Sequence, residues 1–255
     1  MFVTPSVLPT TPGEPRVGFG LKRLDDILKG GLPRTGATLI YGAPYAGKRV
    51  LARSFLLAGV RQGVPAIMVV TDQTATEARE ALSAMDPSYA KFEGAGLVAF
   101  VDTYSRSVGA EDDNPYTEYV DGPTHLDALA IAVTNARRRL VRDRGDHRMV
   151  VNSLSTILRY NGCDATFRFL QTFIGKARRG GATNVFVLQS GLHAEPDVQM
   201  CKHLMDGVLH LDQGSDKHLI RIEGNGVTES RAAVEYRYTP TLFEVTGSIA
   251  SGRII

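Results

Sequence analysis

The stretch Gly42–Arg49, with the sequence GAPYAGKR, has the frame of a phosphate-binding loop except at its last position. In this motif a lysine and a hydroxyl residue follow two spaced glycines. Backbone N–H groups cradle the phosphates, the lysine reaches the β- and γ-phosphate oxygens, and the hydroxyl binds Mg²⁺. Arg49 stands at the hydroxyl position here, and a guanidinium has no lone pair to give a metal. The predicted nucleotide-binding residues are Gly42, Ala43, Pro44, Tyr45, Ala46, Gly47, Lys48 and Arg49.

The segments on either side of this loop predict the elements that its chemistry requires. Residues Ala37–Gly42 have the pattern of a strand that leads directly into the loop, and Lys48–Gly63 have the pattern of the following helix. The order matters because the glycine-rich turn and the helix N-terminus together form the phosphate cradle. This context favours a true phosphate-binding loop over a chance match.

The rest of the chain alternates strand-like apolar runs with helical ones, which predicts βαβ units and a mainly parallel sheet. Beyond Gly207 the runs become short, which predicts an antiparallel extension at the sheet edge. The acidic segment Ser105–His125 is interpreted as a mobile loop, and Thr124 as the N-cap of the next helix. The other predicted strands are Ala66–Thr71, Leu97–Asp102, His147–Ser153 and Asn184–Ser190, and the other predicted helices are about Thr74–Ala84, Thr124–Arg144 and Ala165–Arg179.

Length and composition fit one α/β domain. The chain has 255 residues, of which 43% are hydrophobic, and we expect a flexible tail over residues 1–15 and a single domain over residues 16–255. Because no apolar run reaches the roughly 18 residues of a membrane-spanning helix and no secretory signal is visible, we expect a cytoplasmic protein without membrane insertion. The net charge of +2 gives no argument for nucleic acid.

Three segments resemble the KaiC-like branch of the RecA superfamily. They are Gly18–Lys48 with its GGLP turn, His147–Leu158 and Gly181–Ser190, within a likeness that covers about Arg16–Val245. The resemblance implies a RecA-like three-layer α/β fold, in which helices flank a mainly parallel central sheet and antiparallel edge strands lie at the C-terminal end. It also implies a cytoplasmic ATPase or a relative of one, often assembled as a hexameric ring. We therefore expect a homo-oligomer or another protein as partner.

The chain departs from that family at the positions that would handle Mg²⁺ and water. Asn152 stands where the family has the metal-binding carboxylate of the Walker B strand, so both protein anchors of the ion are replaced. Asp72 and Gln73 stand where the resemblance implies a pair of glutamates that activates water. Asp72 is interpreted equally as a shortened general base or as a cap of the following helix. Both Walker motifs are thus degenerate, and no metal ligand is expected.

Three further positions follow from the resemblance. Gln189 and Ser190 stand where the superfamily has a polar sensor of the γ-phosphate. Arg221 stands in a strand where ring-forming relatives place trans-acting cations, although Glu223 replaces the second cation. An equal interpretation is that Arg221 and Glu223 share the solvated face of an edge strand.

Basic residues gather at the ends of two predicted helices, at Arg137–Arg144 and Lys176–Arg179. They could bind nucleic acid, as relatives of the recombinase branch do. The favoured interpretation is that they complement the helix macrodipole.

These observations predict a pseudo-ATPase with a regulatory or assembly role. Lys48 and Arg49 could offset phosphate charge without a metal, so ATP or ADP is the expected ligand and Mg²⁺ is not expected. The competing hypothesis is that Arg49 fills the pocket or pairs with Asp72 and leaves the site empty. The alternatives are a slow genuine ATPase that uses Asp72 as its base, and a recombinase-paralogue protein that binds single-stranded DNA.

Overall fold

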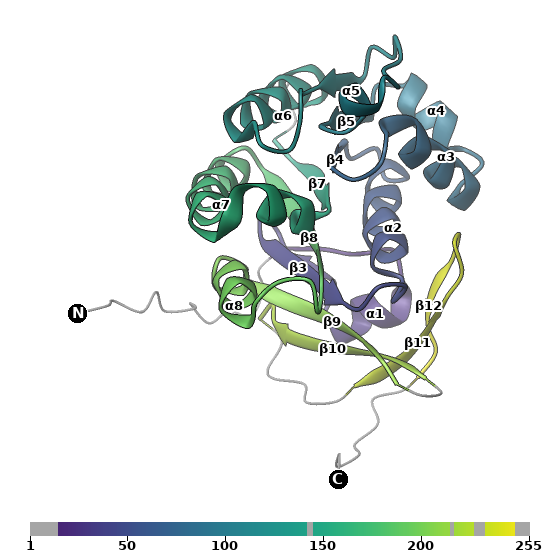
Figure 1. Cartoon of the computed structure of the whole chain (residues 1–255). Coiled ribbons are helices and arrows are strands. Elements are labelled where there is room, and N and C mark those ends of the chain that lie inside the picture. Colours follow the sequence, from purple (N-terminus) through teal and green to yellow (C-terminus); the bar gives the residue numbers. More distant parts are fainter. Residues whose placement is uncertain (1–14, 142–144, 215–216, 227–232, 248–255) are drawn as a thin grey trace.

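A twisted sheet forms the centre of the computed structural model, which describes residues 15–141, 145–214, 217–226 and 233–247 (Figure 1). Within these residues ten strands pair in the order β12-β11-β10-β9-β3-β8-β7-β4-β5-β6. The strands are β3 Ala37–Gly42, β4 Ala66–Val70, β5 Val98–Asp102, β6 Thr117–Tyr119, β7 His147–Asn152, β8 Ala182–Gln189, β9 Gly207–Gln213, β10 His218–Gly224, β11 Val234–Tyr238 and β12 Phe243–Val245. A separate pair, β1 (Arg16–Val17) and β2 (Leu32–Pro33), is antiparallel. The predicted tail lies almost wholly outside the described residues.

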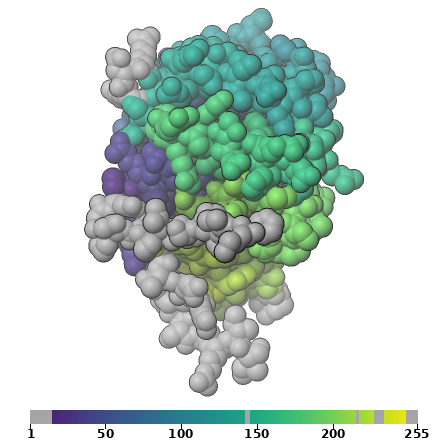
Figure 2. All heavy atoms as spheres, turned by 90° about the vertical axis from the view of Figure 1, so that its left-hand side faces the viewer, coloured from purple at the N-terminus to yellow at the C-terminus, as the bar shows by residue number. Residues whose placement is uncertain are grey.

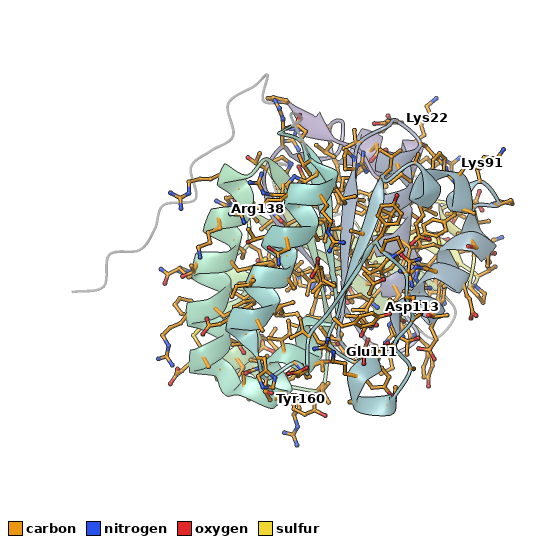
Figure 3. All side chains as sticks on the ribbon, turned by 90° about the horizontal axis from the view of Figure 1, so that it is seen from above. Lys22, Lys91, Glu111, Asp113, Arg138 and Tyr160 are labelled. Atoms are coloured by element: carbon orange, nitrogen blue, oxygen red, sulfur yellow. The ribbon has the colours of Figure 1, made fainter. Side chains whose placement is uncertain are left out.

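Helices cover both faces of the sheet, as Figure 3 shows from above. One core holds apolar residues of α1 to α4 against one face, and a second core holds residues of α6 to α8 against the other. Figure 2 shows that α7 and α8, in green, form much of the outer surface on the second side. The predicted three-layer α/β fold is thereby confirmed. The helices are α1 Lys22–Ile27, α2 Lys48–Val60, α3 Ala75–Met85, α4 Tyr89–Gly94, α5 Ser105–Val108, α6 Leu126–Leu140, α7 Leu154–Arg179 and α8 Glu195–His203.

The central strands are apolar runs because both of their faces are buried. Every residue of β4 and of β5 is buried, and successive side chains enter opposite cores: Met68 and Val70 lie in one, and Ile67 and Val69 in the other. In the described part of the chain, no helix combines the length and hydrophobicity that crossing a membrane requires.

The antiparallel extension begins one strand later than predicted. β9 pairs parallel with β3, and only β10, β11 and β12 run antiparallel to their neighbours. The reason is α8, which the sequence patterns did not reveal and which connects β8 to β9. A crossover of this kind returns the chain to the same end of the sheet, so the next strand is parallel.

The segment Ser105–His125 is not an unstructured loop. It contains α5 and β6, and β6 pairs parallel with β5. The acidic residues that suggested a loop are ion-paired: Arg79 Nη1 lies 3.0 Å from Asp112 Oδ2, and Arg106 Nη1 lies 2.6 Å from Asp121 Oδ1. Composition alone could not reveal these distant partners.

Two helix starts also differ from the predictions. α6 begins at Leu126 with His125 as its N-cap, while the hydroxyl of Thr124 lies 3.3 Å from the His125 ring instead of capping the helix. α7 begins at Leu154 rather than near Ala165, and Gly162, at φ 72° and ψ 175°, interrupts its helical geometry. That glycine interrupts the sequence pattern as well, so only the second part of the helix was predicted.

Candidate functional site

The predicted site residues lie at the carboxyl ends of four neighbouring parallel strands. Gly42 at the end of β3 pairs with Gln189 at the end of β8, and Val70 at the end of β4 pairs with Asn152 at the end of β7. In open parallel sheets this edge is where ligands bind. The topology therefore brings the loop, Asp72, Asn152 and Gln189 to one place.

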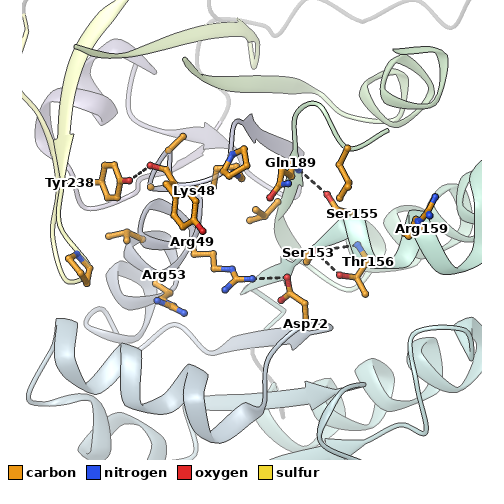
Figure 4. Close-up of a pocket in the computed structure, with 18 of the residues that line it drawn as sticks. Lys48, Arg49, Arg53, Asp72, Ser153, Ser155, Thr156, Arg159, Gln189 and Tyr238 are labelled. Carbon is orange, nitrogen blue, oxygen red and sulfur yellow. Dashed lines mark hydrogen bonds and ion pairs between the residues drawn. The ribbon is translucent and has the colours of Figure 1, made fainter. Parts of the chain in front are cut away.

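A cavity of about 880 Å³ opens at this edge (Figure 4). Such a volume is typical of small-molecule sites. The loop residues Pro44–Arg49 form one wall, and the residues after β4, β7 and β8 form the others. Two residues from the antiparallel part of the sheet also line the cavity. They are Tyr238, at the end of β11, and Pro240, between β11 and β12. The sequence patterns gave no sign of these two residues.

The loop backbone has the shape that its glycines permit. Gly47 caps α2 with φ 76°, in the left-handed region, and a Cβ there would lie 2.8 Å from the ring of Tyr238. A Cβ at Gly42 would lie 2.5 Å from the carbonyl oxygen of Leu211. Tyr238 donates a hydrogen bond to the carbonyl of Tyr45, and Tyr236 donates one of 2.8 Å to that of Ala46. The C-terminal strands thus hold the loop closely, and both glycines are needed for that packing.

Lys48 lies inside the loop and is 8% exposed. Its ammonium donates to the loop carbonyl of Ala43. Burial, and to a lesser extent the charge of Arg49, lowers the pKa of Lys48 to about 8. A cation so poorly compensated favours an anionic ligand within its reach.

Arg49 pairs with Asp72, as the competing hypothesis of an empty site predicted, although the cavity beside the pair is open. Its Nη2 lies 2.7 Å from Asp72 Oδ2, and the dashed line in Figure 4 marks this contact. The two side chains are 46% and 28% exposed. The guanidinium at the metal-ligand position is therefore bonded to the carboxylate at the water-activating position.

The interpretation of Asp72 as a helix cap is wrong. Thr74 caps α3, because its hydroxyl accepts from the backbone N–H of Glu77 and the Glu77 carboxylate accepts from the backbone N–H of Thr74. This reciprocal capping box is visible in the sequence as Thr-Ala-Thr-Glu. It relieves Asp72 of any capping role.

Asn152 is fully buried beneath the cavity and is not one of the residues that line it. Neither polar atom of its side chain has a hydrogen-bond partner among the described residues. The donor set does not fit Mg²⁺, because the two metal positions hold a guanidinium in an ion pair and a buried neutral amide.

Ser153 connects β7 to α7 in a strained conformation, with φ 113° and ψ 82°. Its Oγ accepts a 3.3 Å hydrogen bond from the backbone N–H of Thr156, and its carbonyl accepts one of 2.9 Å from Thr71. A residue other than glycine in such a region costs about 1–3 kcal/mol, and strain of this kind gathers at functional sites.

We expect Ser153→Gly to raise the free energy of unfolding by about 1 kcal/mol, because glycine relieves the strain while a glycine N-cap costs only a few tenths. Ser153→Ala, which retains the strain and loses the cap, should lower it by about 1 kcal/mol. Urea unfolding of both variants measures the two effects. A destabilised Ser153→Gly protein would show that the turn is not strained.

The two proposed sensor residues are placed differently. Gln189 lines the cavity, and its backbone N–H donates a 2.9 Å hydrogen bond to the hydroxyl of Ser155. The backbone N–H of Ser190 donates to the carbonyl of Gly42 at 2.9 Å, and Ser190 is not among the lining residues. Only Gln189 is therefore in position to contact a ligand through its side chain.

Arg221 lies on β10 away from the cavity. Its Nε lies 2.6 Å from Asp212 Oδ2 on β9, and Glu223 lies 2.9 Å from His210. Both residues are exposed on the same face of the strand. This placement agrees with the interpretation that both residues share a solvated face. That Arg221 acts on the site of a neighbouring subunit stays a prediction.

The basic cluster at the end of α6 is largely engaged within the chain. Arg139 pairs with Glu118, and Arg137 donates to the carbonyl of Gly180 at 3.4 Å. On α7, Arg178 lies 2.7 Å from Asp206. Arg142 and Arg144 lie outside the described residues. Binding of single-stranded DNA here stays a prediction, and its measurement is salt-dependent binding that is lost when Arg137–Arg139 are neutralised.

The patterns also missed Arg53, on α2 one turn after Arg49. It lines the cavity, is 8% exposed, and its Nε has no partner among the described residues. Burial and the charge of Arg49 lower its pKa to about 10. Its spacing of four residues from Arg49 is the signal that could have identified it, since such residues share one helix face.

Comparisons with known proteins agree with this architecture. A family model described as "ATPase: KaiC" matches residues 17–229. The chain is 27% identical over 203 residues to a UPF0273 protein of Methanopyrus kandleri, covering 77% of this chain and 76% of that protein. It is 29% identical over 202 residues to a UPF0273 protein of Pyrococcus furiosus, covering 77% and 78%. The crystal structure of a KaiC-like protein from Pyrococcus horikoshii has the same fold, with a TM-score of 0.71 at 18% identity over 91% of this chain and 99% of that chain.

Proposed function

The chain belongs to the KaiC family of ATPases, and from this premise we propose that it is a pseudo-ATPase. It binds ATP or ADP without Mg²⁺ and uses the nucleotide as a structural ligand. The observation that carries the loss of hydrolysis is the 2.7 Å ion pair between Arg49 and Asp72, while the open cavity lined by cations supports binding. One contact engages both the residue that replaces the metal ligand and the carboxylate that could activate water.

Impaired hydrolysis follows from the positions of the acid groups. A general base must come within hydrogen-bond reach of the attacking water, and a small displacement costs rate steeply. One oxygen of Asp72 is bonded to Arg49, and Gln73 cannot accept a proton. The neighbouring Asn152 offers no carboxylate to position a metal.

Binding without a metal is supported by the charges around the cavity. Lys48, Arg49, Arg53 and Arg159 line it, whereas Asp72 is the one carboxylate among its described lining residues. Guanidinium groups bind phosphate oxygens through paired, charge-assisted hydrogen bonds. The loop N–H groups at the start of α2 add the dipole of the helix.

A titration with a fluorescent ATP analogue in EDTA tests the proposal. We expect saturable binding, and Lys48→Ala should weaken it about ten- to a hundredfold, because the variant loses a charge-assisted contact to phosphate. The same titration in Mg²⁺ provides the comparison. No saturable signal in either condition would exclude the nucleotide-binding role.

The regulatory role rests on linkage between binding and conformation. A ligand at one hundred times its dissociation constant stabilises the state that binds it by about 2.7 kcal/mol. The loop touches the antiparallel strands through Tyr236 and Tyr238, so a bound nucleotide would stabilise that edge of the sheet. We propose that this stabilised state is the one that assembles with further copies or with another protein. Light scattering with and without ATP measures the assembly.

A slow genuine ATPase is the second candidate, because Asp72 lines the cavity and its Oδ1 has no partner in the described part of the chain. This oxygen could accept a proton from water if Arg49 moved away. Sensitive phosphate release, compared between the native protein and Asp72→Asn, distinguishes this candidate from the pseudo-ATPase.

A further inference from the structure

Two guanidinium groups meet at one neutral oxygen beside the cavity. Arg49 Nη1 and Arg53 Nη2 each lie 3.4 Å from Gln73 Oε1. The two arginines are four residues apart on α2 and share one face of the helix. Figure 4 shows Arg49 between Asp72 and Arg53, with its guanidinium directed at Asp72. We call Arg49 and Arg53 the arginine pair.

The arginine pair carries more positive charge than its surroundings balance. Asp72 bonds to Arg49, whereas among the described residues the Arg53 side chain makes one hydrogen bond, of 3.4 Å, to the amide oxygen of Gln73, although Arg53 is 8% exposed. Buried charges in proteins are normally paired, because burial without a partner is costly. Lys48 adds a third cation, which donates to the carbonyl of Ala43 and has no carboxylate partner in the part of the chain that the structure describes. An anion with several oxygens could bind to the three cations at once.

The two replacements at the metal positions together change the charge of the site by as much as Mg²⁺ would. Relative to the pattern that the resemblance implies, Arg49 replaces a neutral hydroxyl and Asn152 replaces a carboxylate. Each replacement adds one positive charge to the site, and together they add the charge that Mg²⁺ would bring. Arg53, one helical turn after Arg49, carries a further positive charge beside these positions.

We propose that the cavity selects the metal-free form of a polyphosphate ligand, with the arginine pair in the place of Mg²⁺, and that Mg²⁺ weakens binding. This inference rests on the proposed nucleotide binding and adds to it the ionic form of the ligand and the role of Arg53. Mg²⁺ opposes binding in two ways. It neutralises part of the phosphate charge, and it places a cation against the guanidinium of Arg49.

Arg49 and Arg53 have different tasks in this arrangement. Arg53 is buried and held beside Gln73, so it is a fixed contact for the phosphate. Arg49 is about half exposed, so the exposed part of its guanidinium can contact a phosphate in the cavity while its Nη2 stays bonded to Asp72. The same arginine then contacts the ligand and keeps Asp72 engaged.

Calorimetric titration with ATP, in EDTA and in excess Mg²⁺, tests the inference. We expect the affinity for ATP to be lower by about tenfold or more in Mg²⁺ than in EDTA. The bound Mg²⁺ reduces the charge of the phosphates and is repelled by the guanidinium of Arg49. Arg53→Met should lose about tenfold or more in EDTA. Arg61→Gln is the matched control, because Arg61 is also attached to α2 but pairs with Asp86 at 2.7 Å, outside the lining of the cavity.

The outcomes separate the inference from the function on which it rests. Tight binding that is equal in both buffers, or stronger in Mg²⁺, would overturn the inference and leave nucleotide binding intact. Absence of binding in both buffers would overturn nucleotide binding itself. Because Arg53→Met removes an unbalanced buried charge, its melting temperature without ligand should equal or exceed that of the native protein. An Arg53→Met protein that folds and binds ATP as tightly as the native protein would exclude Arg53 from the site.

Discussion

Replacing both altered metal positions together, by Arg49→Thr and Asn152→Asp, should reverse the effect of Mg²⁺ on nucleotide binding. The double variant regains a hydroxyl and a carboxylate, which are the ligands that Mg²⁺ prefers, and the net charge of the site falls by two units. We expect Mg²⁺ to strengthen ATP binding in this variant by about tenfold or more, whereas it weakens binding to the native protein. Calorimetric titration with ATP, in EDTA and in Mg²⁺, measures the effect of Mg²⁺ on the affinity of each protein.

The single variant Asn152→Asp is the control for this reversal. Asn152→Asp alone places a carboxylate at a fully buried position, so its melting temperature should fall without ligand. Mg²⁺ with ATP should recover more of that stability in the double variant than in Asn152→Asp, because only the double variant also has the hydroxyl. A double variant that still binds ATP more weakly in Mg²⁺ would show that these two positions do not determine the response to the metal.

Nucleotide affinity should fall above about pH 8, through Lys48. Burial lowers the pKa of this lysine to about 8, so the free protein loses the charge of Lys48 as the pH rises through that value. The phosphate binds the protonated form of Lys48. At higher pH the lysine must therefore take up a proton when the nucleotide binds. The affinity should therefore be level below pH 8 and fall by up to roughly tenfold for each pH unit above it.

Lys48→Arg provides the comparison for this pH dependence, because a guanidinium stays charged throughout the range. Titrations in EDTA at several pH values between 7 and about 9.5 would compare the two proteins. Equal affinity of the native protein at both ends of the range would mean that the Lys48 ammonium does not contact the phosphate.

The sequence predicted the parts of this molecule that local spacing determines. The strand, glycine-rich turn and helix around Gly42–Lys48 follow one another directly, and the structure has them in that order. Asp72 and Asn152 were placed at the site by the resemblance to the KaiC-like branch, and the parallel strands that they follow or end bring them to one edge of the sheet.

What the sequence did not predict depends on contacts between distant segments. Tyr238 holds the loop from a strand nearly two hundred residues away, and no local pattern indicates that contact. Arg53 sits in a helix where periodicity assigns charged residues to the surface, yet the cavity wall is the buried face. The segment around Asp112 is ordered by its ion pair with Arg79, which composition cannot show.

The most direct test of the central claim is phosphate release from ATP by the purified full chain in Mg²⁺, beside Lys48→Ala prepared in the same way. The pairing of Arg49 with Asp72 and the replacement of both metal ligands predict release no faster than that of the variant. Magnesium-dependent turnover that disappears in Lys48→Ala would contradict the pseudo-ATPase and identify the chain as an active enzyme.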